Sequence, residues 1–142
     1  MKRLAFAAAL LAVFCTSFLG NSVNAQKEKD KEKGKAHTIK EIMKLAHTDK
    51  AALIKTIAAD LKGDVKWDEV GKKTKELVGL SDELSTSKPP KGSEESWKKV
   101  SGDYNDGAKK LNEAAEKKEL EAAKTALGTL QTSCRGCHTQ HK

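Results

Sequence analysis

The sequence predicts an all-α protein, folded as an antiparallel four-helix bundle. Beyond residue 37, apolar residues recur at spacings of three and four, which is typical of amphipathic helices. No convincing stretch alternates between apolar and polar residues, as a half-buried strand would. Short turn-forming segments separate the helical stretches, and proline occurs only at Pro89 and Pro90. Helices of about 15 to 25 residues joined by short loops favour a bundle.

Residues 1–25 have the pattern of a secretory signal peptide. Lys2 and Arg3 give a positive start, residues 4–19 are almost wholly apolar and uncharged, and a small-residue pattern ends at Ala25. The apolar run is shorter than the about 20 residues that a membrane span needs, which favours a cleaved signal over an anchor. We therefore expect a periplasmic or otherwise exported protein with no membrane attachment after cleavage.

Residues 26–36 are expected to form a charged, disordered tether, because Gln26 to Lys35 contains no apolar side chain. One folded domain, residues 37–142, remains. The formal net charge of +7 is spread over mixed Lys and Glu, which indicates a solvated surface with a bias towards acidic partner proteins. Export, and the lack of a stripe of aromatic and basic residues, argue against nucleic-acid binding.

The first predicted helix spans residues 38–62. Its apolar stripe is interrupted at residues 47–49, where we expect a kink or a break, and Gly63 is placed to cap its C-terminus. A second helix is predicted over residues 67–85. The segment 86–92, which contains both prolines, then forms a connection.

The third predicted helix begins after Ser93, a suitable N-cap, with Glu94 and Glu95 well placed in its first turn. Gly102 and Gly107 each weaken this helix by about 1 kcal/mol relative to alanine. Packing around these glycines must therefore compensate. Aromatic residues on the helix stripes are expected to pack in the core: Trp67, Trp97 and Tyr104.

The fourth predicted helix follows a turn near residues 116–118, begins at Leu120 and carries the motif Cys-x-x-Cys-His. This motif is the pattern for covalent c-type haem attachment. Positions i, i+3 and i+4 of a helix share a face. The thiols of Cys134 and Cys137 can therefore form thioethers with one haem c, and His138 can be an iron ligand.

Two other uses of these residues are less well supported. A redox dithiol would need a thioredoxin-like βαβ context. A structural zinc ion would need four ligands, and Cys134, Cys137, His138 and His141 are crowded at one helix end. The aromatic fraction of 4% predicts a thin core, which a large apolar cofactor between the helices would fill. We expect one haem per chain.

A four-helix bundle with Cys-x-x-Cys-His on its last helix resembles the class II c-type cytochromes, the cytochrome c-prime and cytochrome c556 family, over residues 38–142. The family motif usually continues to an aromatic and then a basic residue. Here His141 stands at the aromatic position and Lys142 at the basic one. The resemblance implies a haem held between the helices and frequent homodimers. It also implies either a Met ligand from the first helix, or an open five-coordinate iron that binds nitric oxide or carbon monoxide.

The sixth iron ligand has three main alternatives, and His37 and His141 are weaker candidates. Met43 lies on the apolar stripe of the first predicted helix, near the family ligand position, although a core Met would also fill space against the haem. In the family, the first helix opens with Ile-Lys, and the ligand follows further along the chain. In this sequence, Ile39 and Lys40 lie closer to Met43 than that family spacing. His47, one turn further, is the chief competitor. An open, five-coordinate iron is the third alternative.

These alternatives lead to two functions. Filled axial positions favour an exported electron-transfer protein, whose basic surface would dock with acidic redox partners. An open iron site favours binding of nitric oxide or carbon monoxide. The sequence offers no catalytic arrangement beyond the haem, so we expect an electron carrier or gas-binding haem protein rather than an enzyme.

Overall fold

The computed structural model describes residues 36–142, and all regular secondary structure in this range is helical. The predicted all-α class is therefore confirmed for this part of the chain. The predicted signal peptide, residues 1–25, and nearly all of the tether, residues 26–36, lie outside the described residues. No helix within the described range is long and apolar enough to cross a membrane.

The first predicted helix is divided in the structure. It consists of α1 (Ile39–Met43), a π-helical turn (Lys44–Thr48) and α2 (Leu53–Asp60). The amide of Asp49 donates to the Lys44 carbonyl at 3.0 Å, which is the wider pairing of a π-helix. The break falls at the interruption predicted from the sequence, so that prediction is confirmed.

The start of α1 is fixed both locally and against a distant helix. Thr38 and Glu41 form a capping box, in which each side chain accepts from the backbone amide of the other residue. His37, just before the cap, donates its backbone amide to Glu83 Oε2 at 2.9 Å, and its Nδ1 lies 3.0 Å from the same oxygen. This contact ties the entry of α1 to the second predicted helix, residues 67–85.

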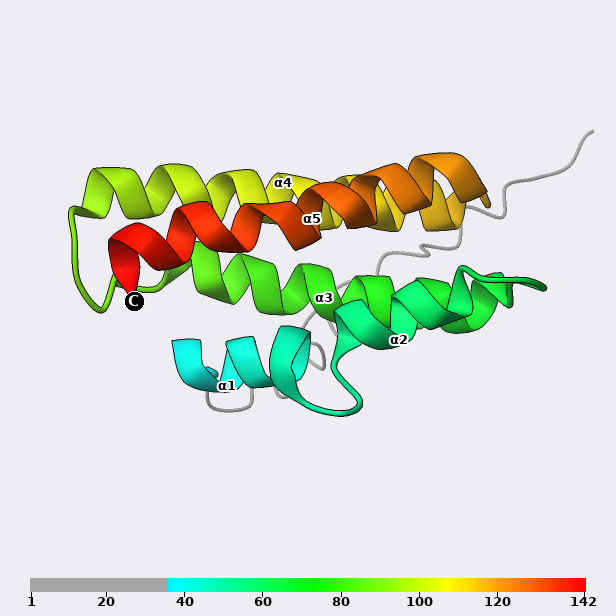
Figure 1. The fold of residues 1–142 in the computed structure, drawn as a ribbon, viewed down its shortest axis with the longest axis horizontal. Coiled ribbons are helices and arrows are strands. Elements are labelled where there is room, and N and C mark those ends of the chain that lie inside the picture. Colours follow the sequence, from blue (N-terminus) through cyan, green and yellow to red (C-terminus); the bar gives the residue numbers. More distant parts are fainter. Residues whose placement is uncertain (1–35) are drawn as a thin grey trace, which may run out of the picture. The chain divides into compact units, whose positions relative to one another are not determined.

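Three long helices complete the described chain: α3 (Trp67–Thr86), α4 (Glu94–Glu116) and α5 (Leu120–His141). Their bounds closely match the predicted ones. Ser93 caps α4 as predicted, because its Oγ accepts from the Ser96 amide. Figure 1 shows that α4 lies alongside both α3 and α5, while α1 and α2 pack along α3.

Polar pairs fix α3 against α4. Thr74 Oγ1 donates to Asn112 Oδ1 at 2.8 Å, and Ser81 Oγ donates to Asn105 Oδ1 at 3.1 Å. The residue number rises along α3 as it falls along α4, so these two helices run in opposite directions. Both hydroxyl-bearing residues are fully buried. Buried polar groups that satisfy one another favour a single register between the two helices.

The core lies between the helices and includes the divided first segment. Fully buried side chains from several helices meet there: Ile42, Ile57, Leu77, Leu111 and Leu130. Trp97 is 4% exposed and Tyr104 is 7% exposed, so the predicted core packing of these two residues is confirmed. Trp67 is only partly buried and packs at the edge of the core.

Only one of the two glycines in α4 is needed for packing. A Cβ atom at Gly107 would lie 2.9 Å from Leu130 Cδ2 on α5. A Cβ atom at Gly102 would meet nothing within 4 Å among the described residues. Packing was predicted to compensate for the helix weakening caused by these glycines. Such packing is found at Gly107, where α4 and α5 approach closely.

Candidate functional site

The Cys-x-x-Cys-His motif lies in the last three turns of α5. Cys134 and Cys137 are free thiols and are both partly buried, whereas the His138 side chain is exposed. The helix is continuous from Leu120 to His141, so the motif residues share one face as the spacing predicted. Cys137 packs directly against the edge of the core.

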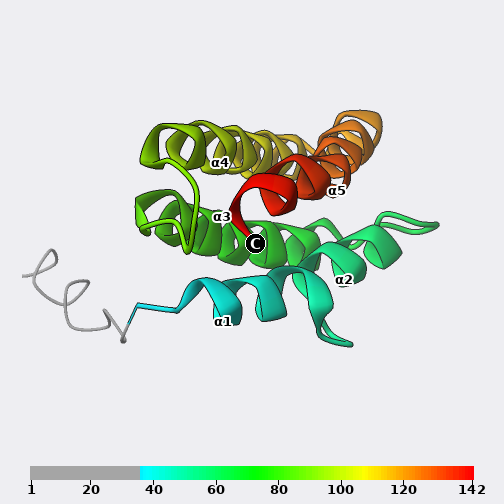
Figure 2. The same ribbon diagram turned by 60° about the vertical axis from the view of Figure 1, so that its left-hand side comes forward.

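An apolar cavity of about 450 Å³ lies against this face. It is formed by α1, the end of α3, the α3–α4 loop, the start of α4 and the last turns of α5. Figure 2 shows the C-terminal end of α5 lying over α1 and α3, where these elements meet. The volume falls in the range of about 300–1,000 Å³ that is typical of cofactor sites. The lining includes Ile39, Met43, Leu84, Trp97, Cys137 and His138.

A smaller cavity of about 70 Å³ adjoins the larger one. The two cavities share four lining residues: Met43, Leu84, Cys137 and His138. The smaller cavity adds five side chains with polar or sulfur atoms: His47, Ser101, Tyr104, Ser133 and Cys134. The structure therefore brings the candidate residues of the first helical segment and those of α5 to one place.

His47 and Tyr104 form a hydrogen-bonded pair in this place. His47 Nε2 lies 2.9 Å from the Tyr104 hydroxyl, and the two rings are tilted with centroids 5.6 Å apart. Burial, and then the positive charge of His138, lower the pKa of His47. Burial, and then the negative charge of Cys134, raise the pKa of Tyr104. Both partners are therefore uncharged at neutral pH.

The Cys137 thiol does not have the character of a redox nucleophile. Burial, and then the charge of Cys134, raise the pKa of the Cys137 thiol. A reactive dithiol has at least one thiol whose pKa is lowered, because the thiolate is the nucleophile. The raised pKa therefore gives no support to Cys137 as the nucleophile of a redox pair.

The structure also does not assemble the zinc site that the sequence allowed. His141 Nδ1 lies 2.8 Å from the Lys91 carbonyl oxygen, and His141 Nε2 lies 3.1 Å from Ser96 Oγ. Both ring nitrogens are therefore engaged away from the two thiols. Across the described part of the chain, no group of three or more His, Cys, Asp or Glu side chains is arranged to hold a metal ion.

Residues 92–142 match the family model described as Cytochrome C'. This match confirms the resemblance to the class II c-type cytochromes. It supports a c-type haem protein, and it covers α4, α5 and the Cys-x-x-Cys-His motif. Met43 and His47 lie outside the matched segment. Neither the comparison with curated proteins nor that with solved structures gives a match.

The site fits the haem that the class II cytochromes bind covalently. Cys137 and the adjacent His138 line an apolar cavity of cofactor size, and Cys134, three residues before Cys137, lines the smaller cavity that adjoins it. Met43 faces the same cavities from α1 and is partly buried. In addition, sequence reasoning missed the contacts of two residues. Tyr104 was expected to pack in the core, and His141 was placed at the family's aromatic position and considered as a zinc ligand, but the hydrogen bonds of these two residues were not predicted.

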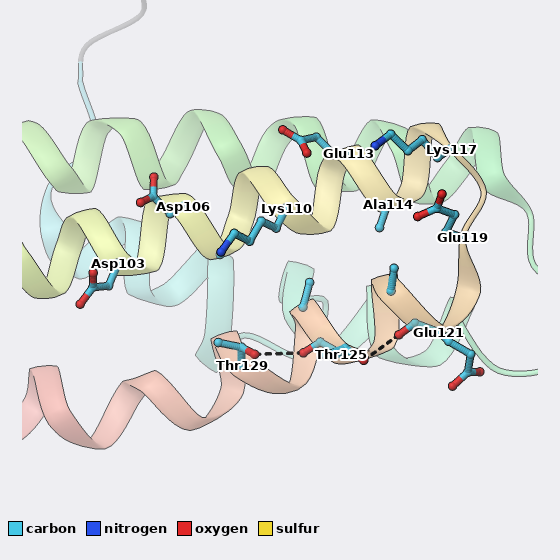
Figure 3. A pocket seen from close by; sticks show the side chains of 13 residues that line it. Asp103, Asp106, Lys110, Glu113, Ala114, Lys117, Glu119, Glu121, Thr125 and Thr129 are labelled. Atoms are coloured by element: carbon cyan, nitrogen blue, oxygen red, sulfur yellow. Dashed lines mark hydrogen bonds between the residues drawn. The ribbon is translucent and has the colours of Figure 1, made fainter.

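A groove with a larger volume, about 810 Å³, lies between α4 and α5 (Figure 3). Its rim carries both carboxylates and lysines: Asp103, Asp106, Glu113, Glu119, Glu121, Lys110 and Lys117. Thr125 and Thr129 on its α5 side donate their hydroxyls to carbonyls of their own helix. None of the cysteine, histidine or methionine candidates lines this groove, so it is not the cofactor site of a class II cytochrome.

Proposed function

We propose that this chain is an exported mono-haem c-type cytochrome that transfers electrons. The observation that carries the proposal is the apolar cavity that Cys137, His138 and Met43 line together. Cys134 and Cys137 hold the haem by thioether bonds, His138 is the proximal iron ligand and Met43 is the sixth ligand. When bound, the haem supplies a one-electron redox centre.

The contacts within the site favour Met43 over His47 as the sixth ligand. Met43 lines both cavities, so its thioether faces the space that the haem would fill. His47 Nε2 is engaged by the Tyr104 hydroxyl, and ligation through that nitrogen would break the bond. Ligation by His and Met raises the reduction potential, which suits a carrier in an oxidising compartment.

The other protein groups of the site bind and shield the haem. The proposal places it between α1, α5 and the α3–α4 loop of an antiparallel bundle, where Leu84 and Trp97 exclude water. Three exposed lysines, Lys40, Lys91 and Lys142, also line the larger cavity. A basic rim at this position would steer an acidic redox partner towards the site.

Export also belongs to the proposal. In this proposal, residues 1–25 are a cleaved signal peptide, residues 26–36 are the tether and residues 37–142 form the bundle. We expect haem attached by Cys-x-x-Cys-His to occur in an exported protein, so the signal and the motif support each other. The proposal includes no membrane attachment after cleavage, and it includes the homodimer that the family resemblance implies.

Binding of nitric oxide or carbon monoxide is the second candidate function. The matching family model is that of cytochrome C', in whose type an apolar side chain stands beside an open iron. The smaller cavity, about 70 Å³ and lined by Met43, Val100 and Tyr104, exceeds the space of about 10–15 Å³ that one water needs. In this alternative Met43 shields the site and does not bind iron.

Absorption spectra of the purified mature protein test these proposals. Ferric and ferrous forms are recorded with and without carbon monoxide, and mass spectrometry measures the covalently bound haem. The double variant Cys134→Ser/Cys137→Ser is the matched control, and it should lack covalent haem. A low-spin spectrum with the weak red band of sulfur-ligated ferric haem, unchanged by carbon monoxide, supports electron transfer. A high-spin spectrum that responds to carbon monoxide supports gas binding, and a wild-type chain without haem overturns both.

A further inference from the structure

His141 is a buried, fully engaged side chain at the end of α5. It is 2% exposed. Its Nδ1 lies 2.8 Å from the Lys91 carbonyl oxygen, and since a carbonyl only accepts, Nδ1 carries the proton. Its Nε2 lies 3.1 Å from Ser96 Oγ, and Ser96 Oγ is also within hydrogen-bond distance of Gln140 Oε1. The last turn of α5 is thus bonded to both the α3–α4 loop and the first turn of α4.

The α3–α4 loop is held from both of its ends. The His141 ring packs edge-on against Trp97, with centroids 5.2 Å apart and an interplanar angle of 79°. Trp97 Nε1 donates to the Ser87 carbonyl at 2.7 Å, at the start of the loop. Gly92 has a φ of +81°, and a Cβ atom there would lie 2.8 Å from His141 Nδ1. The loop can therefore approach α5 this closely because Gly92 has no side chain, and the hydrogen-bonded ring of His141 lies directly opposite Gly92 on α5.

These contacts connect two walls of the larger cavity. Pro90 and Lys91 line the cavity from the loop, and His138 and His141 line it from α5. His138 lies one turn before His141 on the same helix, and the Lys142 amide donates to the His138 carbonyl at 3.3 Å. A bond that fixes His141 therefore also fixes the turn that presents His138.

We propose that His141 is a positioning residue for the haem-binding turn. Its two hydrogen bonds latch the last turn of α5 to the α3–α4 loop and set the orientation of His138. This inference rests on the proposed haem function. The competing interpretation is that the His141 ring only fills the volume that the family gives to an aromatic side chain.

Two substitutions separate the hydrogen bonds from the ring. His141→Phe keeps an aromatic ring against Trp97 but loses both bonds. His141→Asn loses the ring but can place an N–H donor near the position of Nδ1, facing the Lys91 carbonyl. Ser96→Ala removes the partner of Nε2 together with the bond between Ser96 and Gln140, so Gln140→Ala, which removes only the latter bond, is its control. The haem-loaded variants are compared by reduction potential, by ferric absorption spectrum and by amide hydrogen exchange over residues 138–142.

We expect His141→Phe to retain covalent haem, to shift the reduction potential and to exchange the amides of residues 138–142 about tenfold faster. His141→Asn should lie nearer to wild type in exchange and potential. A His141→Phe protein that matches wild type in all three measurements overturns the latch. If His141→Phe does not fold, the comparison of Ser96→Ala with Gln140→Ala decides: faster exchange of the last turn in Ser96→Ala than in Gln140→Ala supports the latch, and equal exchange overturns it. Haem content of the wild type reports separately on the proposed function.

Discussion

The Tyr104 hydroxyl lies 2.9 Å from His47 Nε2, which joins α4 to the π-helical turn across 57 positions of the sequence. Burial lowers the pKa of His47 and raises that of Tyr104, so the bond links two neutral groups beside Cys134. The bond occupies the ring nitrogen through which His47 would otherwise compete for iron. It therefore contributes both to the packing of the first helical segment and to the choice between two candidate ligands.

Tyr104→Phe should lower the free energy of unfolding by about 1 kcal/mol, because it removes a single neutral hydrogen bond from a buried pair. Urea unfolding of the purified protein measures this change. In a His47→Ala background the same substitution should cost less, since the partner is already absent. An equal cost in both backgrounds would show that the bond does not stabilise the fold.

Met43→Leu should remove the sulfur ligand while nearly conserving side-chain volume, so that stability changes by less than about 1.5 kcal/mol. The ferric spectrum should lose its weak red band, and the ferrous protein should bind carbon monoxide. Leu45→Ala is the control, because Leu45 lies in the adjoining π-helical turn and is 36% exposed. Persistence of the red band in Met43→Leu would exclude Met43 as the ligand.

Gly107→Ala and Gly102→Ala should have opposite effects, although both lie in α4. The new Cβ at Gly107 would meet Leu130 Cδ2 at 2.9 Å, and such overpacking costs about 1–3 kcal/mol. The new Cβ at Gly102 meets no described atom within 4 Å, so alanine should stabilise the helix by about 0.5–1 kcal/mol. Thermal or urea unfolding of the two variants measures the difference. Stabilisation by both substitutions would contradict the close packing of α4 on α5.

Glu83→Ala should weaken the fold at neutral pH but not at low pH. The backbone amide of His37, with a smaller contribution from its ring, holds the pKa of Glu83 below its ordinary value. The stabilisation is therefore present above the unfolded carboxyl pKa of about 4.3, and it is lost as the pH falls through the folded pKa. Both side chains are substantially exposed, so the effect should not exceed about 1 kcal/mol.

Urea midpoints of wild type and Glu83→Ala at pH 7 and at pH 3 measure this dependence. The two proteins should differ at pH 7 and converge at pH 3. Glu76→Ala, an exposed glutamate on the same helix, serves as the control and should change little at either pH. A difference that persists at pH 3 would mean that the carboxylate charge is not its cause.

The sequence predicted the features that leave a local or periodic pattern. The long helices, the break in the first helix, the Ser93 cap and the helical placement of the motif all follow from residue spacing and local hydrogen bonding. The haem-binding roles of Cys134, Cys137 and His138 remain predictions from that motif. Their convergence on one cavity with Met43 is a tertiary result that spacing alone did not establish.

The contacts that sequence reasoning missed join residues far apart in the chain. His141 reaches Lys91 across 50 positions, and neither residue type predicts the other. The sequence shows that His141 replaces the aromatic residue that is usual in the family. It does not show the hydrogen-bond partners of His141, because these depend on how the α3–α4 loop folds. The sequence likewise could not separate Gly102 from Gly107, since only the approach of α5 distinguishes them.

The π-helical turn Lys44–Thr48 also has a genetic consequence. A turn of this kind accommodates one residue more than the α-helical turn that would replace it. Deleting one codon there would restore α-helical pairing and rotate α1 by about 100° relative to the chain that follows. Met43 would then leave the cavity wall, while α5 and its motif stayed unchanged. If Met43 binds the haem iron as proposed, a single in-frame deletion would thus remove that ligand and leave the iron site open.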